Sequence, residues 1–340
     1  MSEPAQVRKA TGEVVGQSVA WLIIPVYEDW TALAALLHEV NRVRSAWCFN
    51  VLVVNDHPLP PPEEWLPEPV EGSLRSIRIL SLRRNVGHQR AIALGFCHWL
   101  KIDYSGPVVV MDADGEDRPE DILRLLSAAK EDKWRQVIFA ARQKRSENFV
   151  FRTGYHLYRH LHLWLTGIPV RFGNFSVLSA PHIRALVHQS DLWNHYAAAV
   201  IRSKLPYDSI PTSRGHRLAG RSRMNLAGWV SHGLSALSIY SDIAGTRVLL
   251  ASLAGLACSL LAAGSVGVYA VSTGSPAAYW GVLVALVMTA IFMQIAAATL
   301  IFLFMVLSGR ASATFIPVRD GIVLIGAETT VWTAAREVNG

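Results

Sequence analysis

The chain has 340 residues, of which 51% are hydrophobic and 17% charged, and its formal net charge is +6. This length suits one large α/β domain with an additional part. The cysteines Cys48, Cys97 and Cys258 are too widely spaced for a zinc site or a disulfide framework, so we expect packing roles. The first sixteen residues are polar and contain no apolar core of a signal peptide, which disfavours a secreted domain.

Apolar strands and helices alternate between residues 18 and 141. Strands are predicted at Val19–Pro25, Phe49–Val54, Ser76–Leu82, Val108–Met111 and Gln136–Ala141, and helices at Thr31–Val43, Val86–Leu100 and Pro119–Ala129. This alternation predicts an α/β domain with a mostly parallel, Rossmann-like sheet that is covered by helices on both faces. Ligands bind such sheets at the carboxyl ends of the strands.

Two later stretches, Val248–Val271 and Trp280–Leu307, contain no charged residue. Each exceeds the roughly 20 residues that cross a bilayer core, so we expect a two-helix membrane hairpin. The alternative is a pair of buried core helices. Arg247, Arg310 and Arg319 flank the two stretches, whereas the connecting turn is uncharged. The positive-inside rule therefore predicts an integral membrane protein with both chain ends in the cytoplasm.

Aromatic residues recur at helical spacing in residues 149–165, with arginines and histidines between them. This pattern is typical of a helix in the membrane interface, although an amphipathic core helix fits it as well. A second interfacial helix is predicted over residues 224–246, before the first span. A basic cluster precedes the spans, where anionic lipids or a phosphorylated substrate are better partners than nucleic acid: Arg202, Lys204, Arg214, Arg217, Arg221 and Arg223.

Three acidic residues follow the strand Val108–Met111 at alternate positions, namely Asp112, Asp114 and Glu116. If the backbone stays extended, their side chains lie on one side of the chain. Carboxylate oxygens suit Mg²⁺ or Mn²⁺, and these ions mostly serve substrates that carry phosphates. The spacing therefore predicts a metal site that handles a diphosphate.

Four motifs stand at successive strand ends: Pro25-Val26-Tyr27-Glu28, Asn55-Asp56, Arg84-Asn85-Val86-Gly87 and Asp112-Ala113-Asp114. In this order they resemble the GT-A fold of glycosyltransferase family two, over about residues 19–230. The segment from Met111 to Glu120 is similar to that of the polyprenyl-phosphate glycosyltransferases, the group that includes dolichol-phosphate mannose synthases. Many bacterial members of this group also end in a two-span hairpin.

The sequence patterns and the resemblance together predict a set of parts for the chain. They are a flexible N-terminus (1–17), a cytosolic GT-A domain (18–223), an interfacial helix (224–246), a transmembrane hairpin (247–308) and a cytosolic C-terminal tail (309–340). The resemblance also implies that Asp112 and Asp114 ligate the metal, with Glu116 as a third ligand. A favourable charge at a helix N-terminus is the alternative for Glu116.

The resemblance further assigns residues to the nucleotide. Pro25, Tyr27, Glu28, Asn55 and Asp56 would line the nucleoside pocket, where Asp56 is suited to accept hydrogen bonds from base or ribose. A plain turn remains the alternative for Asn55-Asp56. Arg84 is a candidate donor to the nucleotide, and a surface arginine is the alternative.

The resemblance assigns basic residues to the acceptor phosphate and to the diphosphate that leaves. Arg142 and Arg152 could hold an acceptor phosphate by charge-assisted hydrogen bonds. The segment that begins at Arg217 resembles an R-x-x-G-x-S-K element, in which Arg217, Ser222 and Arg223 would neutralise the leaving group. A basic patch on the membrane surface is the competing interpretation.

The chain departs from the family pattern at two places. His57 and Pro58 stand where the V-D-D-G-S loop has glycine and serine, and Asn55 replaces one of its carboxylates. Gly173-Asn174-Phe175 stands where many relatives have G-D-F, and an amide cannot act as a general base. A lipid monophosphate is already an anionic nucleophile, so Asn174 suits a phosphate acceptor better than a hydroxyl.

We therefore expect inverting, metal-dependent transfer of a sugar from a nucleotide-sugar to a polyprenyl phosphate at the cytosolic membrane face. Mg²⁺ or Mn²⁺ is the expected cofactor, a UDP-sugar is expected ahead of a GDP-sugar, and a bacterial-type inner membrane is the expected location. Assembly into a homo-oligomer stays open. One alternative is a membrane glycosyltransferase that acts on a lipid or polysaccharide hydroxyl. The other is a catalytically silent, membrane-anchored sugar-nucleotide binder or scaffold, against which the acidic motif argues.

Overall fold

The computed structural model describes residues 18–65, 72–102, 106–142, 159–168, 173–220, 233–311 and 314–334. These residues form two units. The first contains residues 18–142, 173–220 and 316–334 of the described chain, and the second contains 159–168, 233–311 and 314–315. The expected flexible N-terminus, residues 1–17, lies outside the described residues.

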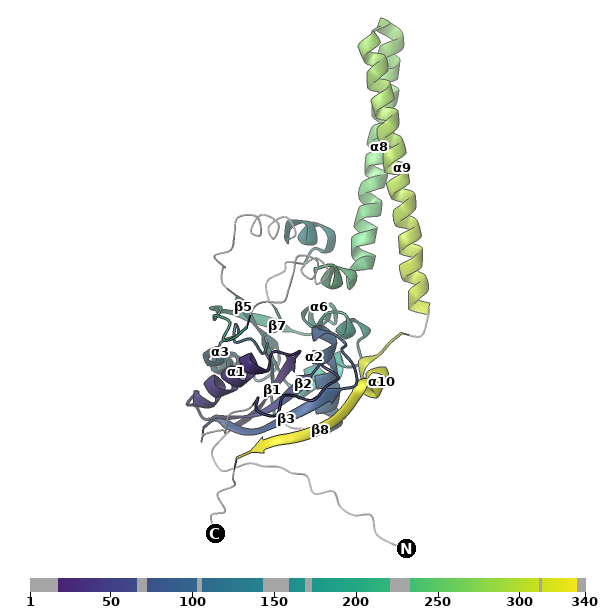
Figure 1. Ribbon diagram of the computed structural model, residues 1–340. Helices are drawn as coiled ribbons and strands as arrows, with labels where there is room; N and C mark the ends of the chain where they lie inside the picture. The colour runs from purple at the N-terminus through teal and green to yellow at the C-terminus, as the bar shows by residue number, and fades with distance from the viewer. Residues whose placement is uncertain are drawn as a thin grey trace, which may run out of the picture. The chain divides into compact units, whose positions relative to one another are not determined.

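An eight-stranded sheet forms the first unit, in the order β7-β5-β6-β4-β1-β2-β3-β8 (Figure 1). Its strands are β1 (Ser18–Val26), β2 (Trp47–Asn55), β3 (Leu74–Leu82), β4 (Val108–Val110), β5 (Val137–Arg142), β6 (Ser176–Leu178), β7 (Tyr207–Thr212) and β8 (Ile325–Thr333). The β1 strand runs parallel to β2 and β4, β2 to β3, and β5 to β7. Only β6 and β8 run antiparallel to their neighbours, so the prediction of a mostly parallel sheet is confirmed.

Helices cover both faces of this sheet. They are α1 (Trp30–Arg42), α2 (His88–Lys101), α3 (Pro119–Glu131), α5 (Ala180–Leu186), α6 (Tyr196–Arg202) and the short 3₁₀ helix η1 (Ser190–Trp193). Side chains of a strand alternate between the faces, so Leu22 and Ile24 of β1 join the apolar core with α1 and α3. Trp21 and Ile23 join the core with α2, α5 and α6. The periodicity of the apolar residues thus produces two buried layers.

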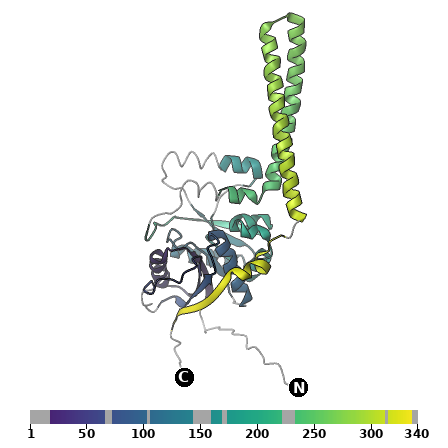
Figure 2. The same ribbon diagram turned by 45° about the vertical axis from the view of Figure 1, so that its right-hand side comes forward.

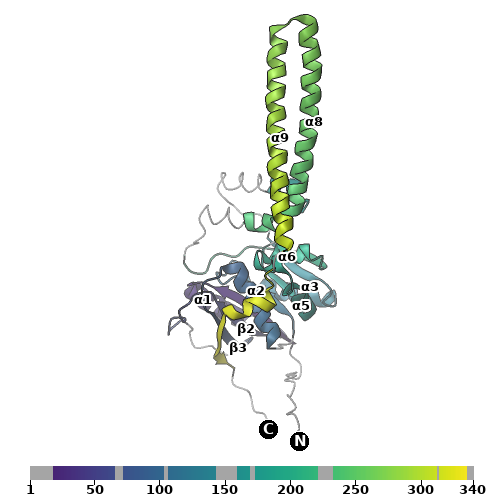
Figure 3. The same ribbon diagram turned by 90° about the vertical axis from the view of Figure 1, so that its right-hand side faces the viewer.

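The C-terminal segment belongs to the sheet and is not the tail that we expected for residues 309–340. After α10 (Pro317–Asp320) and η2 (Gly321–Leu324), strand β8 pairs antiparallel with β3 (Figure 3). Glu328 of β8 accepts a hydrogen bond from Arg78 Nη1 at 2.9 Å, and its other oxygen lies 2.5 Å from His98 Nε2. This strand is mostly exposed and lacks a strong apolar pattern, which explains why the sequence did not predict it.

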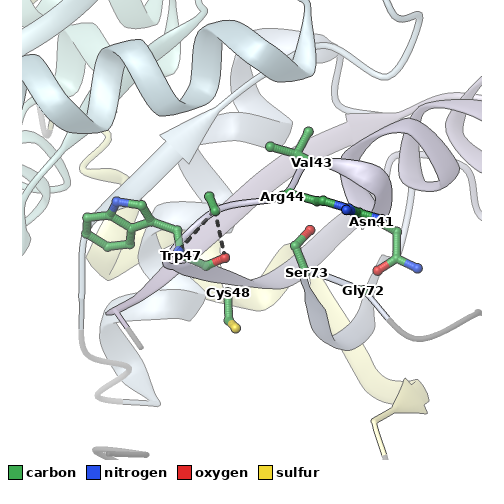
Figure 4. A pocket seen from close by; sticks show the side chains of 8 residues that line it. Asn41, Val43, Arg44, Trp47, Cys48, Gly72 and Ser73 are labelled. Atoms are coloured by element: carbon green, nitrogen blue, oxygen red, sulfur yellow. Dashed lines mark hydrogen bonds between the residues drawn. The ribbon is translucent and has the colours of Figure 1, made fainter. Parts of the chain in front are cut away.

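A cavity of about 200 Å³ lies at the opposite end of the sheet from the strand-end motifs (Figure 4). Its lining comes from the end of α1, the start of β2 and the residues before β3: Asn41, Val43, Arg44, Ser45, Trp47, Cys48, Gly72 and Ser73. Asn41 Oδ1 accepts the backbone N–H of Leu74 at 3.0 Å, and Ser73 Oγ donates to Val40 O at 2.7 Å. These polar groups therefore fix the entry of the chain into β3.

The second unit contains the two long helices α8 (Ser241–Thr273) and α9 (Pro276–Ala311), which lie side by side and antiparallel (Figure 2). Both are long and apolar enough to cross a membrane, and they contain the two predicted spans. Small residues let the helices approach, because Gly255 faces the ring of Phe292. Thr289 also donates a hydrogen bond to Ser259 at 2.9 Å.

Part of the first predicted interfacial segment is described, and residues 159–166 are helical as expected. Leu161 and Trp164 are exposed on this helix. Arg247 Nη1 donates to the carbonyl oxygen of Trp164 at 2.7 Å, so this arginine satisfies a carbonyl at the end of the helix. Residues 149–158 and 224–232 of the two predicted segments lie outside the described residues.

Candidate active site

The four sequence motifs meet at one edge of the sheet. Strands β4, β1, β2 and β3 are neighbours and run parallel to one another, so their carboxyl ends lie together. Tyr27, Asn55, Arg84 and Asp112 each stand at or shortly after the end of one of these strands. This is the end of the sheet at which α/β proteins bind ligands, and the four motifs lie there together.

The acidic loop, residues 112–116, turns sharply after β4. Gly115 has a φ of +81°, and the backbone N–H of Glu116 donates to Asp114 Oδ1 at 3.0 Å. The backbone N–H of Asp112 donates to the buried carboxylate of Asp117 at 3.1 Å. The extended backbone that would align three carboxylates is therefore absent from this loop.

A basic segment, residues 214–220, folds onto the acidic loop. Arg217 donates to Asp114 Oδ2 at 3.2 Å and to Asp29 Oδ2 at 2.8 Å. Arg214 forms an ion pair with Glu116. These contacts place guanidinium groups directly beside the predicted metal carboxylates.

Backbone contacts reinforce this arrangement. The N–H of Gly215 donates to the carbonyl of Glu116 at 2.9 Å, and that of Leu218 donates to the carbonyl of Asp114 at 3.0 Å. The side chain of Leu218 covers Gly115, since a Cβ at residue 115 would lie 2.4 Å from Leu218 Cγ. The sequence predicted a role for Arg217, but it gave no signal for its contact with Asp29 or for the pairing of Arg214.

Asn55 and Asp56 hold two loops of the site in place. The amide of Asn55 donates to Leu59 O at 2.9 Å and accepts from His57 N–H at 3.1 Å. The carboxylate of Asp56 accepts the backbone N–H groups of Val86 and Gly87 at 2.7 and 2.8 Å. Burial raises the pKa of Asp56, and these two hydrogen bonds oppose the shift. Both side chains are therefore engaged in shaping the loops.

The predicted nucleoside residues near the end of β1 are more accessible. Pro25 is buried within the strand, whereas Tyr27 is exposed. Glu28 adopts a φ of +58°, which is uncommon for a residue with a side chain, and its carboxylate lies 3.3 Å from His57 Nε2. The ring of His57 also lies 5.5 Å from that of Tyr27. Tyr27, Glu28 and His57 therefore lie together near the end of β1, where the sequence predicts the nucleoside pocket.

The structure describes only some of the remaining predicted site residues. Arg84 is exposed beside the turn that Asp56 holds. The backbone of Arg142 ends β5, while its side chain lies outside the described part of the chain. Arg152, Ser222 and Arg223 also lie outside the described residues.

His88 connects the acidic loop to Asn174, which lies two residues before β6. Its Nε2 lies 3.2 Å from Asp112 Oδ1 and 3.0 Å from Asn174 Nδ2. Desolvation by the surrounding atoms lowers the pKa of His88, but Asp112 above all, followed by Asp56 and Asp114, raises it overall above the ordinary value. The sequence singled out Asn174 but gave no link to His88, because 86 positions separate the two.

The acidic side chains at this end of the sheet suit a divalent metal ion that is bound by two protein ligands. Among the residues that the structure describes, no group of three His, Cys, Asp or Glu side chains could hold a metal ion. Asp112 and Asp114 supply hard carboxylate oxygens at the ligand-binding edge, whereas Glu116 pairs with Arg214. Mg²⁺ is commonly bound through one or two carboxylates together with substrate phosphates and water, and this pair fits that pattern.

Comparison with known proteins identifies the class of this α/β domain. The model of Glycosyl transferase family 2 matches residues 21–194, just over half of the chain. The chain therefore belongs to glycosyltransferase family 2. With the observed sheet, this confirms the expected fold class, a GT-A glycosyltransferase domain accompanied by two long apolar helices.

Individual relatives match different shares of the chain. An undecaprenyl-phosphate 4-deoxy-4-formamido-L-arabinose transferase from Klebsiella pneumoniae is 28% identical over 43% of this chain and 43% of its own length. The chain thus matches less than half of that relative. The uncharacterized glycosyltransferase YkcC from Bacillus subtilis is 25% identical over 70% of this chain and 72% of its own length.

Among solved structures, glucosyl-3-phosphoglycerate synthase from Mycobacterium tuberculosis, in complex with Mn²⁺, UDP-glucose and phosphoglyceric acid, is similar with a TM-score of 0.46. It is 13% identical and covers 68% of this chain and 80% of that chain.

Proposed function

We propose that this protein transfers a sugar from a nucleotide-sugar to a polyprenyl phosphate, with inversion at the anomeric carbon. The observation that carries the proposal is the basic segment folded onto the acidic loop at the carboxyl ends of the strands. Carboxylates for a metal ion and guanidinium groups for a diphosphate meet there in a chain of glycosyltransferase family 2. Two helices of membrane-spanning length in the same chain support a lipid acceptor.

The donor diphosphate would bind between the acidic loop and the basic segment. Asp112 and Asp114 would hold Mg²⁺ or Mn²⁺, which stabilises the charge of the departing nucleoside diphosphate when it is bound. Arg217 would exchange its contact with Asp114 for the diphosphate, because a guanidinium group binds phosphate oxygens in the same way as carboxylates. Ser222 and Arg223 remain proposed to complete this contact.

The nucleoside would bind beside Tyr27, Glu28 and His57. Asn55 and Asp56 would act through the loops they hold, and Arg84 would donate to the nucleotide from the adjoining turn. A UDP-sugar is proposed ahead of a GDP-sugar.

Two relatives, from two strains of Klebsiella pneumoniae, are undecaprenyl-phosphate 4-deoxy-4-formamido-L-arabinose transferases, which supports undecaprenyl phosphate or a similar lipid as the acceptor. Arg142 and Arg152 are proposed to hold its phosphate. An oxygen of this phosphate would form a bond to the anomeric carbon, while the bond from that carbon to the diphosphate breaks and its electron pair leaves with the nucleoside diphosphate. The nucleophile is an anion, so the step requires no base at Asn174.

The route of the chain supports a topology with both ends of the hairpin on one side. Residues before the hairpin and strand β8 after it belong to the same sheet, so an even number of crossings must separate them. Arg247, Arg310 and Arg319 flank the helices and favour the cytoplasmic side for that sheet. We therefore place the reaction at the cytosolic face of a bacterial-type inner membrane.

A transfer assay tests the proposal. The full chain in lipid nanodiscs is incubated with radiolabelled UDP- and GDP-sugars, undecaprenyl phosphate and Mg²⁺ or Mn²⁺, and label in the organic phase is counted. We expect label from one of these sugars, abolished by Asp114→Asn and retained by Asp208→Asn, a matched change at an exposed site. The absence of lipid-linked label with every donor would contradict the proposal.

A further inference from the structure

A chain of hydrogen bonds determines which way the amide of Asn174 points. It begins at the backbone N–H of Tyr196, which donates to Gln89 Oε1 at 2.7 Å. A backbone N–H can only donate, so the atom of Gln89 that faces it must be the oxygen. The orientation of the Gln89 amide follows from this contact alone.

The orientation of Asn174 follows from that of Gln89. Gln89 Nε2 donates to Asn174 Oδ1 at 3.2 Å, so the amide nitrogen of Asn174 points the other way, toward His88 Nε2 at 3.0 Å. Reversing the Asn174 amide would bring two NH₂ groups together. Both side chains are buried, with Gln89 9% and Asn174 8% exposed, and an unmatched donor is costly in such surroundings.

The backbone of Asn174 is fixed as well. Ser176 Oγ donates to the carbonyl of Asn174 at 2.8 Å and lies 2.7 Å from the hydroxyl of Tyr196. In the antiparallel pair of β4 and β6, Val110 lies opposite Ser176. Asp112 follows Val110 by two residues and Asn174 precedes Ser176 by two, and both lie within 3.2 Å of His88 Nε2, so Asn174 is beside the acidic loop.

We propose that Asn174 donates a hydrogen bond to an anionic oxygen of the acceptor phosphate, and that Gln89 is the positioning residue that keeps the Asn174 NH₂ group turned toward the site. This inference rests on the proposed function and specifies how its acceptor is recognised. His88 Nε2 also lies 3.2 Å from Asp112 Oδ1, and a ring nitrogen whose hydrogen faces that carboxylate cannot accept from Asn174, so the hydrogens of the Asn174 NH₂ group are directed to the phosphate oxygen. A carboxylate at residue 174 would instead repel both the phosphate and Asp112.

The first test is Asn174→Asp, which restores the residue of the family's G-D-F segment with almost no change in size. If Asn174 is a donor to an anion, the KM for undecaprenyl phosphate rises roughly 10- to 100-fold while the KM for the nucleotide-sugar stays within about twofold. If the reaction instead requires a general base at residue 174, the same variant raises kcat. An increase in kcat, or an unchanged KM for the lipid, overturns the inference.

The second test is Gln89→Glu, which keeps an oxygen for the Tyr196 N–H and removes the donor to Asn174. The Asn174 amide then turns its NH₂ group toward residue 89, so we expect the KM for the lipid phosphate to rise about tenfold. Gln189→Glu makes the same change at an exposed position and should leave both KM values unchanged. A thermal-unfolding midpoint close to that of the wild type identifies the folded variants.

The proposed function and the role of Asn174 fail on different results. A wild-type protein without transfer activity contradicts the proposed function. An active wild type in which Gln89→Glu and Asn174→Asp leave the lipid KM unchanged, or change both KM values equally, contradicts the inference alone.

Discussion

The closed arrangement of the basic segment over the acidic loop predicts that Gly115→Ala impairs the reaction. Gly115 adopts a φ of +81°, and a Cβ at this position would lie 2.4 Å from Leu218 Cγ and 2.5 Å from Leu218 Cδ1. Nonbonded carbon atoms do not approach each other this closely, so Leu218 must move. Its backbone N–H then loses the carbonyl of Asp114, which it meets at 3.0 Å.

The magnitude follows from two terms. A left-handed backbone costs alanine about 1 kcal/mol relative to glycine, and loss of the hydrogen bond from Leu218 costs about 1 kcal/mol more. Together these terms disfavour the closed arrangement by about 2 kcal/mol, which corresponds to roughly a 30-fold loss in kcat/KM for the nucleotide-sugar.

Two further variants separate the clash from the strain. Adding Leu218→Ala to Gly115→Ala removes the clash and should restore most of the activity, leaving roughly a fivefold deficit from the strained backbone. Gly220→Ala, in the same segment, introduces the strain without the clash, since φ is +74° and its Cβ would meet no atom closer than 3.9 Å. Initial rates of label transfer measure all four proteins. Wild-type activity in Gly115→Ala, or no recovery in the double variant, would refute this reasoning.

Three other predictions concern the metal, the C-terminal strand and a buried thiol. Glu116→Gln should leave the Mn²⁺ affinity, measured by electron paramagnetic resonance, unchanged, since Glu116 pairs with Arg214. A large loss of Mn²⁺ affinity would instead show that Glu116 is a third metal ligand. Glu328→Ala should lower the free energy of unfolding in urea by about 2–3 kcal/mol, because it leaves the buried His98 without its carboxylate; a change below about 0.5 kcal/mol would contradict this. Burial raises the pKa of Cys97 to about 12, so iodoacetamide at pH 8 should modify it only after unfolding, and rapid labelling of the native protein would count against the burial.

Much of the α/β fold was predictable because its strands are apolar and end in polar motifs. Strand β1 was expected at Val19–Pro25 and spans Ser18–Val26, and helix α3 was expected to begin at Pro119 and does so. Proline at the first helical position and acidic residues after it made that boundary clear. The strand β8 was missed because its alternation is weak and its partner β3 lies about 250 residues earlier.

The candidate site was predictable as a location but only partly as a set of contacts. Strand-end position indicated Asp112 and Asp114, because topology alone gathers the ends of parallel strands. The sequence could not show that Asp56 holds a neighbouring turn, or that Gln89 orients Asn174. Such contacts depend on side-chain directions across long sequence separations, and neither periodicity nor composition records them.

The central claim is that an anionic lipid phosphate is the nucleophile. The most direct measurement compares undecaprenyl phosphate with undecaprenol as acceptors for the wild-type protein, with the labelled nucleotide-sugar that gives the highest transfer rate. We expect label on undecaprenyl phosphate and none above background on undecaprenol, because the site supplies no base at Asn174 to deprotonate a hydroxyl. Equal or faster transfer to undecaprenol would contradict it.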